Sequence, residues 1–132
     1  MEMDQFVPRV LLVEDDPHVL RAVRRVLTSI GADAVPTHSC AAARLAAAQL
    51  SHFDLVIADR SLGDGDGVAC AIELKERYGC ATLIYSAQLR PAGTLAGVDA
   101  WVQKPGAAGE LGRTVRTLLD ARNRDARRAS AG

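Results

Sequence analysis

Short, continuously apolar runs alternate along the chain with longer stretches in which apolar residues recur every three to four positions. The clearest runs are VLLV at 10–13, LVIA at 55–58 and TLIY at 82–85, and none of them alternates between apolar and polar residues. Runs of this kind are typical of strands covered on both faces of a parallel sheet. Weaker strands are expected at about 33–37 and 100–102.

The stretches between these runs predict helices. Apolar residues recur at helical spacing between Val19 and Ile30, with Asp16 placed to cap the helix and Pro17 suited to its first position. The alanine-rich segment behind Ser39 is a strong helix former. Further helices are expected after the loop at 59–67, as one short helix within 91–96, and from about 111 to 119.

Five strands that alternate with five helices predict βαβ units. The expected fold is therefore α/β, with a doubly wound, five-stranded parallel sheet flanked by five helices, the fourth of them short. The expected domain covers residues 8–122, with an N-terminal extension at 1–7 and an Arg-rich flexible tail at 123–132.

Composition narrows the possible classes of protein. A chain of 132 residues with 48% hydrophobic content fits one globular domain. It has neither a run of about 20 apolar residues nor a secretory leader, so we expect a cytoplasmic location and no membrane partner. Sixteen basic and sixteen acidic residues cancel, which makes nucleic acid an unexpected partner. The three cysteines show no metal-ligand spacing.

The reactive side chains gather at the ends of the predicted strands. Glu14 and Asp15 end the first strand, Asp59 the third, Ser86 the fourth and Lys104 the fifth. In an open parallel sheet these ends meet along one edge. Carboxylates without histidine or thiolate favour Mg²⁺, and a lysine with a hydroxyl can bind an anion. Together they predict a phosphoryl-transfer site with an aspartate as nucleophile.

The stretch ADRSLGDGDG at 58–67 also invites comparison with a calcium-binding loop. Started at Asp64, the EF-hand pattern fails at its fifth, sixth and twelfth positions. Asp66 and Gly67 are instead expected to turn the chain and cap the next helix, and Asp64 to lie on the loop surface.

Four segments, VLLVEDDP, DLVIAD, the pair Ser86-Ala87 and VQKP, resemble the signature regions of response-regulator receiver domains in the same order and at the same strand positions. The resemblance covers about residues 8–122 and implies the flavodoxin-like receiver fold. It also implies a phosphorylation-controlled receiver of a bacterial two-component or phosphorelay system. A sensor histidine kinase or histidine phosphotransfer protein would donate the phosphoryl group, and a downstream protein would bind the face of helix 4, strand 5 and helix 5.

The same resemblance implies a separate role for each acidic residue. Asp59 would be the phosphoacceptor. Mg²⁺ would be bound by Asp15, by Asp59, by Glu14 through water, and by the backbone carbonyl of Ser61.

The resemblance assigns the remaining site residues to the phosphate and to the switch. Ser86, Ala87 and Lys104 would surround the phosphoryl group. Ser86 and Trp101 would change position on phosphorylation, and a cis peptide before Pro105 would direct Lys104 into the site. Tyrosine or phenylalanine is usual at the Trp101 position, which leaves the standard switching motion open here.

Other functions stay open from sequence alone. The leading hypothesis is a stand-alone receiver, monomeric or weakly dimeric, that catalyses only its own aspartyl phosphorylation and dephosphorylation. The main alternative is a degenerate receiver acting as a phosphorylation-independent protein-interaction module, suggested by Trp101 and the short fourth helix. An Mg²⁺-dependent phosphohydrolase is disfavoured by Ser61, because such enzymes place an aspartate there. A receiver segment of a longer DNA-binding regulator is the remaining possibility.

Overall fold

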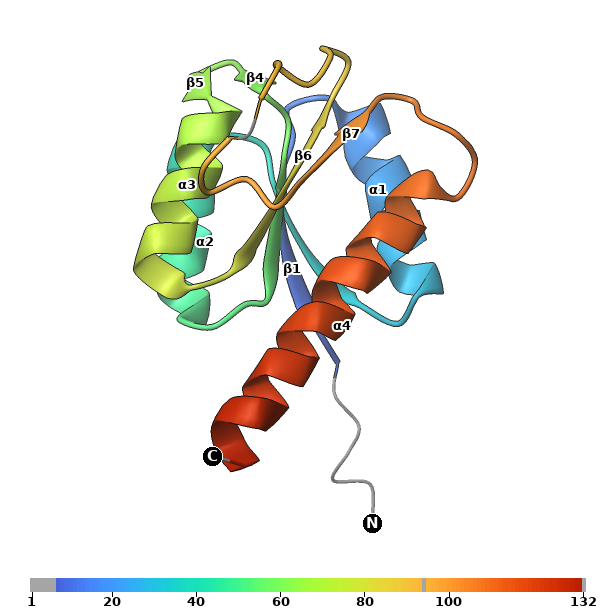
Figure 1. Cartoon of the computed structure of the whole chain (residues 1–132). Coiled ribbons are helices and arrows are strands. Elements are labelled where there is room, and N and C mark those ends of the chain that lie inside the picture. The colour runs from blue at the N-terminus through green and yellow to red at the C-terminus, as the bar shows by residue number, and fades with distance from the viewer. Residues whose placement is uncertain (1–6, 94, 132) are drawn as a thin grey trace.

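Five parallel strands form the central sheet of the computed structural model, which describes residues 7–93 and 95–131. The strand order is β2-β1-β3-β6-β7 (Figure 1). A separate two-stranded antiparallel ribbon, β4–β5, lies in the loop that follows β3. The bounds are β1 Arg9–Val13, β2 Asp33–Thr37, β3 Leu55–Ala58, β4 Ser61–Leu62, β5 Gly65–Asp66, β6 Ala81–Ser86 and β7 Ala100–Gln103.

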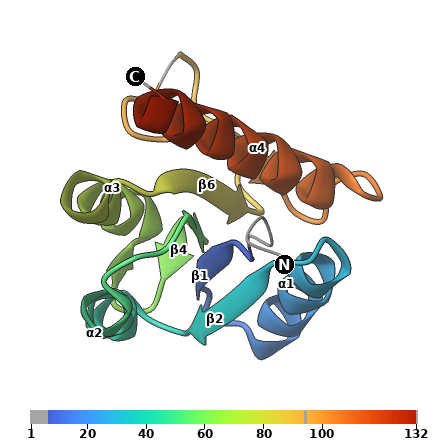
Figure 2. The ribbon, with the colours of Figure 1, turned by 90° about the horizontal axis from the view of Figure 1, so that it is seen from below.

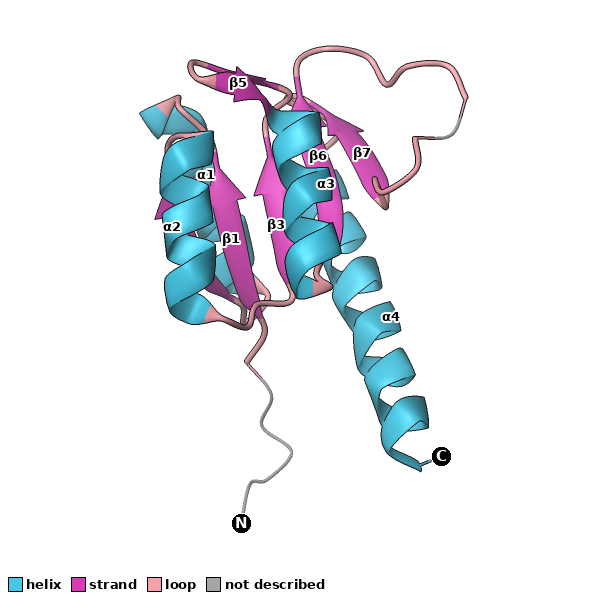
Figure 3. Cartoon of the chain, turned by 90° about the vertical axis from the view of Figure 1, so that its left-hand side faces the viewer, coloured by secondary structure: helices cyan, strands magenta, loops and turns pink. Residues whose placement is uncertain are grey.

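Four helices cover the two faces of the sheet, with α1 and α4 on one face and α2 and α3 on the other (Figures 2 and 3). The predicted caps are confirmed: Asp16, Ser39 and Asp66 each accept a hydrogen bond from a backbone N–H in the first turn of their helix. These bonds satisfy amides that the helix itself leaves free. The bounds are α1 Pro17–Ser29, α2 Cys40–Leu50, α3 Gly67–Tyr78 and α4 Glu110–Ala131.

The continuous apolar runs are explained by burial on both sides of the sheet. Every residue of β3 is buried, while β2, which contains Pro36, is an edge strand and only its last residue is buried. One core layer lies between the sheet and α1 with α4, and the other between the sheet and α2 with α3. No helix within residues 7–93 and 95–131 is long and apolar enough to cross a bilayer.

The predicted α/β fold with its five-stranded parallel sheet is confirmed, with one difference between β6 and β7. The described residues of that connection, 87–93 and 95–99, contain bends and turns and no helix where a short fourth helix was expected. Pro91 interrupts the segment, and Gly93 and Gly97 have φ angles of 85° and 86°, which lie outside the helical region. The last helix, expected as the fifth, is therefore α4.

The two ends of the chain bear on the predicted domain limits. Residues 1–6 of the expected N-terminal extension lie outside the described residues. Residues 123–131, expected as a flexible tail, are the final turns of α4. Exposed helix ends fray readily, so the mobility of this segment stays a prediction.

A hydrogen-bond network around the Asp99 carboxylate ties the irregular β6–β7 connection to the sheet. The Asp99 carboxylate accepts hydrogen bonds from the backbone N–H of Thr82, at 2.8 Å, and from the Thr82 hydroxyl, at 3.2 Å. It also accepts from the Lys75 ammonium, at 2.8 and 2.9 Å. Partial burial acts to raise the pKa of Asp99, but the hydrogen bonds from Lys75 and Thr82 outweigh it and hold that pKa below its ordinary value.

Replacing Asp99 by alanine is expected to lower the free energy of unfolding by about 1–3 kcal/mol, because the backbone N–H of fully buried Thr82 loses its acceptor. Since folding lowers the pKa of Asp99, its contribution is present above the unfolded value of about 3.9 and is lost as the pH falls through the lower folded value. In urea unfolding, the wild type and Asp99→Ala should thus differ in free energy of unfolding at pH 7, and this difference should shrink below about pH 4. A difference independent of pH would contradict this account.

Gly67 allows α3 to begin directly against the backbone of Asp59. A Cβ atom at this position would lie 1.6 Å from the Asp59 carbonyl oxygen. The Gly67 N–H donates to the Arg60 carbonyl at 2.7 Å, which holds the loop closed. Only glycine fits here without displacing the segment that carries Asp59.

Gly67→Ala is therefore expected to destabilise the fold by more than about 2 kcal/mol. Gly112→Ala, in the first turn of α4, is the matched control. A Cβ atom at Gly112 would only touch a methyl group of Val26 in α1, at 3.4 Å. The control should be neutral or stabilising by up to about 1 kcal/mol. Gly67→Ala should lower the urea midpoint while Gly112→Ala leaves it unchanged or raises it, and equal midpoints in the two variants would contradict the close approach at Gly67.

Candidate functional site

The Lys104 ammonium joins two of the carboxylates at the carboxyl edge of the sheet. Its Nζ lies 2.7 Å from Oε1 of Glu14 and 3.1 Å from Oδ2 of Asp59. Glu14 is 5% exposed, so this bridge lies at the base of the site rather than on its surface. The same Nζ lies 5.6 Å from the centroid of the Tyr85 ring, close enough for a cation–π contact.

Backbone hydrogen bonds just beyond the strand ends fix the positions of these residues. The Asp59 N–H donates to the Val13 carbonyl at 3.0 Å, and the Lys104 N–H to the Ser86 carbonyl at 2.8 Å. The ladder of the sheet thus continues by one residue and carries each functional side chain to the same edge. The peptide bond between Lys104 and Pro105 is cis.

Burial and charge set the protonation of the bridge. Burial raises the pKa of Glu14 above its ordinary value, and the hydrogen bond and charge of Lys104 offset only part of that effect. Burial acts in the opposite sense on Lys104, but Glu14 and Asp59 outweigh it and raise the pKa of the ammonium. The site therefore keeps one firmly held positive charge facing its carboxylates.

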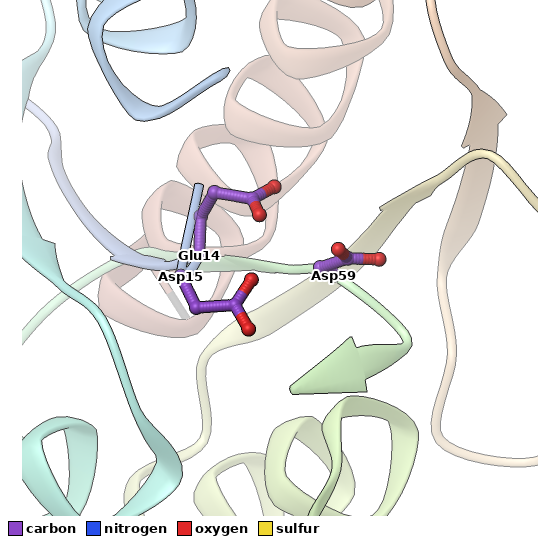
Figure 4. Close-up of side chains that lie close together, drawn as sticks. All are labelled: Glu14, Asp15 and Asp59. Atoms are coloured by element: carbon purple, nitrogen blue, oxygen red, sulfur yellow. The ribbon is translucent and has the colours of Figure 1, made fainter. Parts of the chain in front are cut away.

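Three carboxylates in this site form a group that could hold a metal ion. Glu14 and Asp15 follow β1 and Asp59 follows β3, and their side chains lie close together in Figure 4. One oxygen from each lies within 4.8 Å of the others. Asp15 is exposed and Asp59 is half-buried, so the group opens to solvent on one side. A donor set of oxygen atoms alone suits a hard divalent cation such as Mg²⁺.

A second cluster lies beside the carboxylates and connects two loops to a strand of the sheet. The Gln88 side-chain amide donates to the Ser61 hydroxyl at 3.0 Å. The Trp101 indole N–H donates to the Gln88 carbonyl at 3.1 Å, and the Arg60 guanidinium lies 6.0 Å from the centroid of the indole ring. Trp101 is half-buried in this arrangement. The loops after β3 and β6 are thereby linked to β7.

Ser86 lies at the same edge but bonds within its own turn. The residue is 2% exposed, and its side-chain oxygen accepts a hydrogen bond from the Gln88 N–H at 3.2 Å. The neighbouring Ala87 is exposed, and its carbonyl accepts from the Gln103 amide at 3.3 Å. The structure thus brings Glu14 and Asp59 onto Lys104, while the Ser86 hydroxyl has a different partner among the described residues.

Asp64 has a structural role that its sequence position did not suggest. Its carboxylate accepts hydrogen bonds from the backbone N–H groups of Cys40 and Ala41, both at 3.0 Å. These two bonds lower the pKa of Asp64. Asp64 therefore fastens the loop after Asp59 to the first turn of α2, where the helix leaves amides free and favours negative charge.

The sequence matches one described protein family over most of its length. Residues 10–116 match the family of the response regulator receiver domain. The KDP operon transcriptional regulatory protein KdpE of Escherichia coli (strain K12) is 30% identical over 114 residues, which are 83% of this chain and 50% of that protein. The chain therefore spans about half the length of this curated relative.

Solved structures show the same fold at low sequence identity. A CheY-like receiver domain protein from Methanospirillum hungatei JF-1 superposes with a TM-score of 0.77 at 22% identity, over 91% of this chain and 99% of that one. CheY4 of Vibrio cholerae superposes with a TM-score of 0.74 at 24% identity, over 86% of this chain and 100% of that one. The signal receiver domain of an HD domain-containing protein from Pseudomonas fluorescens Pf-5 superposes with a TM-score of 0.79 at 18% identity, over 89% of this chain and 98% of that one.

The family match covers more than half of the chain, and the arrangement of strands agrees with it. The predicted resemblance is therefore confirmed. The chain belongs to the response regulator receiver domains, the signalling modules of two-component systems.

Proposed function

We propose that Asp59 accepts a phosphoryl group from a phosphohistidine donor and that this modification controls the binding of a partner protein. The observation that carries the proposal is the Lys104 ammonium, held against Asp59 at 3.1 Å and Glu14 at 2.7 Å. A lysine placed beside a half-buried aspartate can pair with an anion attached to that aspartate. The complete set of acids and lysine also favours this function over a phosphorylation-independent module.

The donor set fits Mg²⁺. Asp15 and Asp59 would bind the ion directly, Glu14 through water, and the backbone carbonyl of Ser61 would add a neutral ligand. When bound, Mg²⁺ would neutralise negative charge on the transferred phosphoryl oxygens.

The chemistry of the chain itself is a displacement at phosphorus. A carboxylate oxygen of Asp59 forms the new bond to phosphorus while the bond from phosphorus to the donor's imidazole nitrogen breaks, and the electron pair stays on that nitrogen. Lys104 exchanges its contact with Asp59 for one with a phosphoryl oxygen and remains anchored to Glu14. The oxygen of Ser86 accepts the Gln88 N–H, which leaves the hydroxyl proton free to be donated to the phosphoryl group.

Signal transfer would follow from the contacts of Ser86 and Gln88. A movement of Ser86 toward the phosphoryl group displaces Gln88, which holds both Ser61 and the Trp101 indole. Release of the indole changes the surface formed by the β6–β7 connection and β7. The donor would be a sensor histidine kinase or a histidine phosphotransfer protein, and a downstream protein would bind this surface near β7 and α4 in one phosphorylation state.

Phosphorylation by acetyl phosphate with Mg²⁺ tests the proposal directly. Intact-mass spectrometry should show the wild type gaining the mass of one phosphoryl group, which Asp59→Asn should not gain because the amide is a poor nucleophile. Asp66→Asn is the matched control, since Asp66 caps α3 only seven positions further along the chain and should be phosphorylated normally. Modification of Asp59→Asn at the wild-type rate would disprove the role of Asp59.

The metal site has an equally close control. Asp15→Asn removes a carboxylate from the acidic group and should weaken Mg²⁺ binding about tenfold or more in isothermal titration calorimetry. Asp16→Asn removes the neighbouring charge, but its side chain can still accept the His18 N–H as the α1 cap. Equal losses in both variants would mean that general negative charge, and not this cluster, attracts the ion.

A further inference from the structure

The arginines of the chain are concentrated on one face of the sheet. Helices α1 and α4, which cover that face, contain nine arginines and three acidic residues, and α1 contains no acidic residue. Helices α2 and α3 on the other face contain three basic and two acidic residues. The net charge of zero therefore conceals a basic helical layer.

Most of the α4 arginines lie in one stripe. At 100° per residue they fall within a sector of about 120°, opposite the buried side chains of Leu111, Val115 and Leu119. The stripe is about 22 Å long. The final turns of α4, which carry its last arginines, extend beyond the end of the sheet (Figure 1). All five side chains are exposed: Arg113, Arg116, Arg124, Arg127 and Arg128.

The part of the chain that the structure describes leaves these five charges without an acidic partner. Within residues 7–93 and 95–131, none of the five arginines forms an ion pair, whereas Arg44 is paired with Glu73. Arg122 lies outside the stripe and donates to the Gly79 carbonyl of the domain body. Two acidic residues, Glu110 and Asp120, lie in the same sector of α4 as the stripe. Neither forms an ion pair among the described residues, and Glu110 instead accepts the Ala107 N–H at 3.3 Å. The stripe is therefore available to an anionic partner.

The α1 helix extends the basic surface sideways. Its three arginines, Arg21, Arg24 and Arg25, are exposed and line a surface hollow together with Ser29. Ser29 also borders the groove between α1 and α4, whose wall includes Arg113 and Arg116. The two helices thus present one connected surface.

We propose that this arginine surface binds the phosphate backbone of double-stranded DNA without reading its sequence. A guanidinium fork matches a phosphate in a bidentate manner, and a duplex presents one negative charge per about 1.7 Å along its axis. Neither α1 nor α4 contains an aromatic residue, which disfavours base stacking on a single strand. On the exposed face of α4 the residues beside the arginines are polar, such as Thr117 and Asp120, and offer nothing to insert into a lipid bilayer. The binding requires neither Asp59 nor its phosphorylation.

Fluorescence anisotropy with labelled 20-base-pair duplexes of two unrelated sequences tests the proposal on the full chain. The two duplexes should bind equally, and binding should weaken steeply as salt rises. The triple variant Arg124→Ala/Arg127→Ala/Arg128→Ala lies in exposed helix away from the core. It should bind about tenfold or more weakly, with a salt slope reduced by about three.

A matched triple variant, Arg44→Ala/Arg77→Ala/Arg90→Ala, removes the same charge from other surfaces and should bind like the wild type. Circular dichroism should show equal helix content in all three proteins, and Arg113→Ala/Arg116→Ala gives a second test should the first triple variant unfold. Equal weakening in both triple variants would overturn the proposal. So would tighter binding to single-stranded RNA, to polyglutamate or to phosphatidylserine vesicles than to the duplex.

Discussion

The structure of the site depends on the repulsion between carboxylates and on the one ammonium that relieves it. Glu14 and Asp59 come from separate strands and lie on either side of Lys104. Without that ammonium, Glu14 would be a buried carboxylate with no compensating charge, which is strongly unfavourable. Lys104 therefore stabilises the strand ends in the arrangement that the chemistry requires. The same cation is then in place to meet a phosphoryl group.

The loop after Asp59 is held by contacts that have nothing to do with the chemistry. Gly67 permits α3 to start against the Asp59 carbonyl, and Asp64 attaches the loop to the first turn of α2. These two contacts join both helices of one face to a single loop. The backbone that carries Asp59 is thus held by contacts additional to those of its side chain with Lys104.

The sheet and the edge carrying the site could be predicted because each depends on short-range patterns. Continuous apolar runs indicate buried parallel strands, and the topology of such a sheet then collects Glu14, Asp59 and Lys104 at one edge. Contacts between distant segments could not be predicted this way. Asp64 meets α2 across 24 positions, and the Trp101 indole meets the Gln88 carbonyl across the irregular β6–β7 connection.

The distribution of charge over the folded surface also could not be predicted from the charge count. Counting gives a neutral chain, but folding separates the acidic edge of Glu14, Asp15 and Asp59 from a helical layer rich in arginine. Surface charges interact weakly beyond a Debye length of about 8–10 Å. At separations beyond that length, a polyanion on α4 would sense phosphorylation of Asp59 chiefly through the packing of α1 and α4 against the sheet, and only slightly through the field of the phosphate.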